Sequence, residues 1–108
     1  MQFNLFAVAA LLACEAFASK ITYACRYNGK DLQGKDKVVT EQKAGGTIPD
    51  DKDDDVVNDI GKWSNNDFSA KKNARTGIVI VTNTKVAKNK AEATDQNNEA
   101  QQIVKKHT

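Results

Sequence analysis

The residues most able to do chemistry in this chain are basic ones gathered in its last third. Residues 69–108 carry eight lysines and arginines against three acidic residues. Lys71, Lys72 and Arg75 fall within five consecutive positions of that segment. Clustered cations attract phosphate groups without regard to base sequence, and the attraction weakens with salt. We therefore predict that these three residues form an RNA-binding patch. The alternative is an ordinary solvated surface.

The middle of the chain is acidic and invites a calcium interpretation. Residues 46–68 carry seven aspartates against two lysines. Within residues 50–55, alternate aspartates match the first, third and fifth ligand positions of a helix-loop-helix calcium site. That site also needs Gly at its sixth position and Glu at its twelfth. Val56 and Lys62 stand there instead. We expect a solvated acidic loop, no metal site and no cofactor.

One cysteine and one histidine, Cys25 and His107, follow residue 18. Two such residues are too few for a zinc site. His107 is the penultimate residue, where chains usually fray, so a catalytic Cys–His pair is not favoured. Cys25 has no cysteine partner in residues 19–108. It is expected either to be a buried free thiol or to link two chains into a toxin-like secreted dimer. We expect a monomer.

Residues 1–18 are typical of a cleavable signal peptide. The unbroken apolar stretch from Leu5 to Ala13 is too short to span a bilayer, which needs about 20 residues. Small residues near its end fit cleavage before Ser19. The first four residues depart from the pattern because they lack Lys and Arg. We expect a secreted protein with a single domain over residues 19–108 and no membrane association in its mature form.

The hydrophobic patterning after residue 18 predicts an α+β domain. Apolar residues alternate from Ile21 to Tyr27, which predicts a strand with Ile21, Tyr23 and Cys25 on one face. The run Gly77–Asn83 is rich in β-branched residues and predicts a central strand. The other expected elements are a helix over Lys30–Ala44, a strand over Val56–Trp63, a short strand at Ile103–Val104, and polar loops over 47–55, 64–75 and 89–100. This order predicts one N-terminal helix packed on an antiparallel β-sheet.

Short motifs along the chain resemble one family. Tyr23, Ala24 and Cys25 form a Tyr-x-Cys motif just after the predicted cleavage site. The motif resembles that of the RNase-like secreted effectors of powdery mildew fungi, which are related to fungal guanyl-specific ribonucleases. Further stretches follow in that family's order: Ile48-Pro49-Asp50, Lys62-Trp63, Arg75 and Ile78–Asn83. The resemblance implies a microbial-ribonuclease-like fold.

The same resemblance implies that catalysis has been lost. Ribonuclease chemistry of this type needs a general base and a general acid, usually Glu and His. Lys62 stands at the place of the Glu, Asp50 at that of one His, and Glu92 nearest to the other, while Arg75 survives as a cation. We expect a non-catalytic fungal effector that binds host RNA or a host protein, outside the host cell or within it. The alternative is an active ribonuclease that uses Asp50 and Glu92 as a carboxylate pair.

Overall fold

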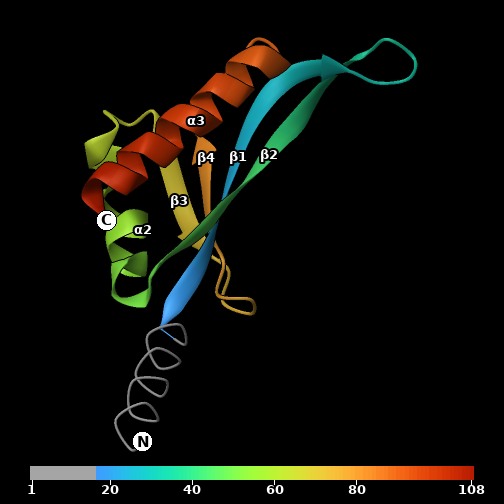
Figure 1. Ribbon diagram of the computed structural model, residues 1–108. Coiled ribbons are helices and arrows are strands. Elements are labelled where there is room, and N and C mark those ends of the chain that lie inside the picture. The colour runs from blue at the N-terminus through green and yellow to red at the C-terminus, as the bar shows by residue number, and fades with distance from the viewer. Residues whose placement is uncertain (1–16) are drawn as a thin grey trace, which may run out of the picture.

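Two α-helices pack against one face of a four-stranded sheet in the computed structural model, which describes residues 17–108 (Figure 1). The expected α+β class is confirmed. The elements in chain order are β1 (Ala18–Lys30), β2 (Asp36–Pro49), the 3-10 turn η1 (Asp50–Lys52), α2 (Asp53–Trp63), β3 (Phe68–Lys72), β4 (Val79–Asn83) and α3 (Lys90–His107). Residues 1–16 of the predicted signal peptide lie outside the described residues.

The sheet is mixed, with strand order β2-β1-β4-β3. β1 pairs antiparallel with β2, and β3 pairs antiparallel with β4. β1 and β4 are parallel, and Ile21 to Tyr23 pair there with Val79 to Val81. The expected purely antiparallel sheet is therefore wrong. The chain passes through α2 and β3 before β4 joins β1, and this connection brings β4 in beside β1 in the same direction.

The segment predicted as an N-terminal helix is a hairpin turn followed by β2, so that prediction is wrong. The Asp31 carboxylate closes the turn by accepting the backbone N–H groups of Gln33 at 2.8 Å and Lys35 at 2.9 Å. Gly34 has a φ of +77°, which favours glycine. The β-branched run Val38–Thr40 then suits a strand, and β2 pairs with nearly the whole of β1.

The strand predicted over Val56–Trp63 is also wrong, because these residues belong to α2. Three aspartates occupy the first turn of the helix, where the positive end of its dipole favours negative charge. Val56 and Ile60 are buried one turn apart, which is the spacing of a helix face. The acidic run thus begins a helix and is not a loop.

The polar segment after residue 89 forms the second helix, α3, where a loop and a short strand were expected. The side chain of Asn89 caps it by accepting the N–H of Glu92 at 2.9 Å. The buried face of α3 repeats every three or four residues and consists of Ala93, Asn97, Ala100 and Val104. This face is small and partly polar, which hid the helix from a hydrophobicity-based reading.

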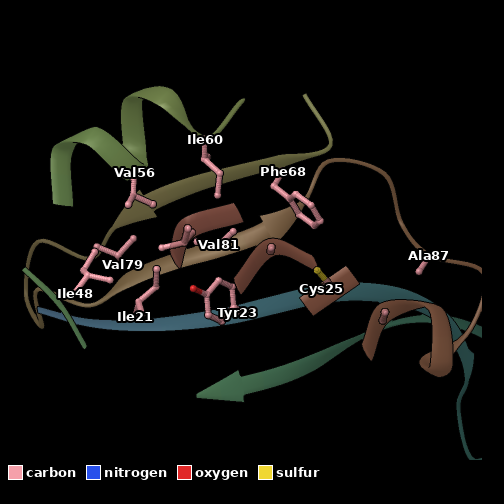
Figure 2. Packing of buried hydrophobic residues seen from close by; sticks show 13 residues of the cluster. Ile21, Tyr23, Cys25, Ile48, Val56, Ile60, Phe68, Val79, Val81 and Ala87 are labelled. Atoms are coloured by element: carbon pink, nitrogen blue, oxygen red, sulfur yellow. The ribbon is translucent and has the colours of Figure 1, made fainter. Parts of the chain in front are cut away.

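Two strand predictions are confirmed. β1 and β4 are present, and Ile21, Tyr23 and Cys25 all point into the core between sheet and helices (Figure 2). Phe68 joins that core from β3, within a segment predicted as loop. No helix within residues 17–108 is long and apolar enough to cross a membrane.

Candidate nucleic-acid interface

The sheet has a second face that no element of residues 17–108 covers. Side chains alternate along a strand, so the residues between the buried ones of β1 and β4 point away from the helices. These side chains are exposed or half-buried. We call this surface the open face, and it comprises Lys20, Thr22, Ala24, Arg26, Thr40, Gln42, Ser69, Lys71, Ile80 and Thr82.

The open face is positively charged. Lys20, Arg26 and Lys71 lie on it, and none of its residues is acidic. By strand alternation, Asp36 points to the same side at the far tip of the β1–β2 hairpin, where it pairs with Lys30. The three cations are therefore not neutralised by carboxylates of the strands that carry them, and the face presents a field that attracts anions.

Arg26 is the best-positioned cation of the open face, and the sequence gave no specific sign of it. Its Nη2 donates to the carbonyl oxygen of Asn83 at 2.7 Å and lies 3.4 Å from that of Thr84. Its Nε is buried and has no hydrogen-bond partner within residues 17–108. The guanidinium is thus held at the end of β4 rather than free in solvent, and a fixed fork loses less entropy on binding a phosphate.

The backbone at Arg26 is held by the side chain of Asn83. The Asn83 Oδ1 accepts the Arg26 N–H at 2.9 Å, and its Nδ2 donates to the Arg26 carbonyl oxygen at 2.9 Å. The same Nδ2 donates to Oε1 of Gln96 in α3 at 2.7 Å. A buried carboxamide thereby continues the β1–β4 pairing past the end of β4 and ties it to α3.

The predicted patch does not form one surface. Lys71 lies on the open face, whereas Lys72 points to the helix side and places its Nζ 2.8 Å from Oδ2 of Asp53. Arg75 lies in the β3–β4 turn, where the side chain of Asn73 accepts its backbone N–H at 2.9 Å. The structure therefore joins Lys71 to Arg26 and Lys20 instead, and RNA contact by the predicted trio stays a prediction.

Lys72 belongs to a polar network that fastens α2 to the start of β1. The carboxylate of Asp53 is 1% exposed, and its Oδ2 also accepts from Oγ of Ser19 at 2.6 Å. The Ser19 Oγ lies 2.9 Å from Oδ1 of Asp50. Hydrogen bonding and charge from Asp53 raise the pKa of Lys72. This lysine compensates a buried carboxylate, which is a structural role.

The two carboxylates proposed for an active ribonuclease lie at opposite ends of β1. Asp50 is beside Ser19 at the start of that strand. Glu92 lines a depression with Thr84, whose carbonyl oxygen is near Arg26. Seven residues of strand separate Ser19 from Arg26, which corresponds to about 23 Å. The structure does not bring Asp50 and Glu92 together.

Cys25 and His107 are also apart. The Cys25 side chain is fully buried, and burial raises the pKa of its thiol to about 11. Its backbone N–H donates to Oδ1 of Asn97 in α3 at 3.0 Å. His107 lies ten residues farther along α3, about 15 Å away. There it stacks on Trp63 with ring centroids 4.3 Å apart, so the penultimate residue is packed.

The Tyr-x-Cys motif therefore serves packing. Tyr23 and Cys25 are core residues, and only Ala24 reaches the open face. Cys25 is a buried free thiol in the described chain, in line with the first of the two alternatives for this residue. Within residues 17–108, no group of three His, Cys, Asp or Glu side chains gathers as metal ligands would.

Comparison of the chain with models of protein families, with curated proteins and with solved structures found no match in any of the three.

Proposed function

We propose that the mature protein is a secreted, non-catalytic effector that binds RNA through the open face. One observation carries the proposal: Lys20, Arg26 and Lys71 lie on a sheet face that has no carboxylate among its residues and no covering element within residues 17–108. Their attraction for phosphate does not depend on base sequence.

The expected binding is modest and sensitive to salt. Three phosphate contacts give a slope of log K against log salt of about −2.7 on a duplex and about −2.1 on a single strand. Non-specific nucleic-acid binding of this kind has a Kd of roughly 10⁻⁴ to 10⁻⁶ M at physiological salt. A protein of this affinity acts where RNA is abundant.

The family resemblance supports the same function, but the proposal does not depend on it. The motif order suggests a secreted RNA-related protein that lacks the usual catalytic Glu and His. The chain after β1 continues as a strand, so an N-terminal ribonuclease-like helix is no part of the proposal. Lys62 ends α2 and Asp50 lies before it, and neither is on the open face.

The test uses the full-length precursor expressed in a eukaryotic secretion host. Protein recovered from the medium is identified by mass, incubated with total RNA at several salt concentrations, and the RNA is then run on a gel. We expect a chain that begins at Ser19, salt-sensitive binding and intact RNA. Cleaved RNA would contradict the non-catalytic assignment. Absence of binding at low salt would contradict RNA as the ligand and favour a host protein.

A further inference from the structure

We infer that the open face prefers double-stranded RNA to single-stranded RNA, and this inference rests on the proposed function. The observation that carries it is the placement of the aromatic side chains of residues 17–108: Phe17, Tyr23, Tyr27, Trp63 and Phe68. None of these rings belongs to the open face, whose apolar members are Ala24 and Ile80.

Each ring is committed elsewhere. Tyr23 and Phe68 are buried in the core, and Tyr27 packs against it from the helix side of β1. Trp63 stacks on His107. Phe17 precedes the predicted cleavage site and lines a depression with Pro49, away from the cations. Proteins that hold single strands rely on aromatic side chains to stack successive bases. The open face offers single strands no such platform.

Without stacking, the density of phosphates decides which ligand binds better. Lys20 and Arg26 are six residues apart on β1, which corresponds to about 20 Å. Over that length a duplex presents roughly 12 phosphate charges and a single strand roughly 6. With three contacts, counterion release alone makes duplex binding about fourfold tighter at 0.1 M salt.

The polar groups between the cations fit the ribose side of a duplex. Thr40 and Ser69 are exposed hydroxyls on the open face, and Gln42 adds an exposed carboxamide. A-form RNA displays its 2′-hydroxyl groups in a wide, shallow minor groove, while its major groove is too narrow for side chains to read. A sheet face with short hydroxyl side chains can approach the shallow groove and exchange hydrogen bonds with 2′-hydroxyls. DNA lacks these partners.

The experiment compares three probes with the mature secreted protein at one salt concentration. The probes are a 20-base-pair RNA duplex, one of its strands chosen to be unstructured, and a DNA duplex of the same sequence. We expect the RNA duplex to bind at least fourfold more tightly than the single strand, and more tightly than the DNA. The double variant Thr40→Val/Ser69→Ala should lose the preference for RNA over DNA duplex while keeping the salt slope.

The outcomes separate the inference from the proposed function. Equal or tighter binding of the single strand would overturn the duplex preference and leave RNA binding in place. Equal binding of the two duplexes by the unaltered protein would overturn the ribose contacts. Failure to bind any of the three probes would overturn the proposed function itself. A double variant that unfolds is replaced by the single changes, each checked by circular dichroism.

Discussion

Lys71 and Lys72 are neighbours in β3, yet their side chains lie on opposite faces of the sheet. Lys71 points to the open face that also carries Lys20 and Arg26. Lys72 points to the helix side and pairs with the buried carboxylate of Asp53 at 2.8 Å. Strand alternation thus divides an apparent pair of RNA-binding lysines into one residue available to a ligand and one that serves the fold.

This division predicts different consequences for the two lysines. Lys71→Gln should reduce the salt slope of RNA binding by about 0.7 to 0.9, because one phosphate contact is lost. Lys72→Gln should leave the slope unchanged and lower Tm, since Asp53 then keeps a buried charge without its cation. Fluorescence anisotropy and thermal unfolding measure the two effects. Equal losses of RNA affinity in both variants would contradict the division.

The hydroxyl of Ser19 should contribute to stability through Asp53. Ser19→Ala removes a donor from a carboxylate that is 1% exposed. We expect the free energy of unfolding to fall by about 1 to 2 kcal/mol, measured by urea denaturation. Ser69→Ala is the matched control, because Ser69 is exposed on the open face. A similar loss in both variants would show that the Ser19–Asp53 contact contributes nothing specific.

Asn97 should be a stability residue even though it is polar. Its carboxamide accepts the N–H of Cys25 at 3.0 Å and donates to the carbonyl oxygen of Glu41 at 2.7 Å. Cys25 and Glu41 are register partners across β1 and β2, so Asn97 locks α3 onto that hairpin. Asn97→Ala should lower the free energy of unfolding by about 2 to 3 kcal/mol, because two backbone groups lose their partner.

The control for that variant is its sequence neighbour. Asn98 lies on the next position of α3 and contacts the side chain of Lys43. Asn98→Ala should cost less than about 1 kcal/mol, as expected for a partly exposed polar contact. Equal effects at positions 97 and 98 would indicate a general loss of helix α3 rather than loss of the bridge between the strands.

Cys25 should make the protein less stable in alkali. Burial raises the pKa of its thiol from 9.0 to about 11, so the folded state retains the proton that the unfolded state releases. The contribution is fully present below pH 9 and is lost as the pH rises toward 11. Tyr23, whose pKa burial raises from 10.0 to about 12, adds a second loss above pH 10.

The interval between pH 9 and 10 therefore isolates the thiol. Urea denaturation there should show a falling free energy of unfolding in the unaltered protein and a flatter profile in Cys25→Ala. The folded protein should also react slowly with a thiol reagent below pH 9, and quickly once denatured. Rapid reaction of the folded protein, or a thiol-sensitive dimer on a non-reducing gel, would contradict a buried free thiol.

The sequence was informative where hydrophobic periodicity is strong. Alternation in Ile21, Tyr23 and Cys25 predicted β1 and its buried face, and the β-branched run before Asn83 predicted β4. It failed where long-range pairing decides the outcome. Residues 36–49 contain good helix formers, but pairing along β1 makes them a strand.

Local signals existed for both helices but were weak in hydrophobicity. The first turn of α2 is acidic, and Val56 and Ile60 have helical spacing. α3 begins with an Asn89 cap and buries alanines and an asparagine. For the candidate site, the sequence predicted Lys71 but not Lys20 or Arg26. Those two could be assigned only after the helices had been placed on one face of the sheet.

The most direct test of the account is the salt dependence of RNA binding in two charge-matched double variants. Lys20→Gln/Lys71→Gln removes two cations from the open face, and Lys88→Gln/Lys105→Gln removes two exposed cations just before and within α3. We expect the first variant to reduce the salt slope by about 1.4 on a single strand and about 1.8 on a duplex. The second variant should bind as the unaltered protein does. Equal reductions in the two variants would show that RNA responds only to net charge, and would contradict a binding site on the open face.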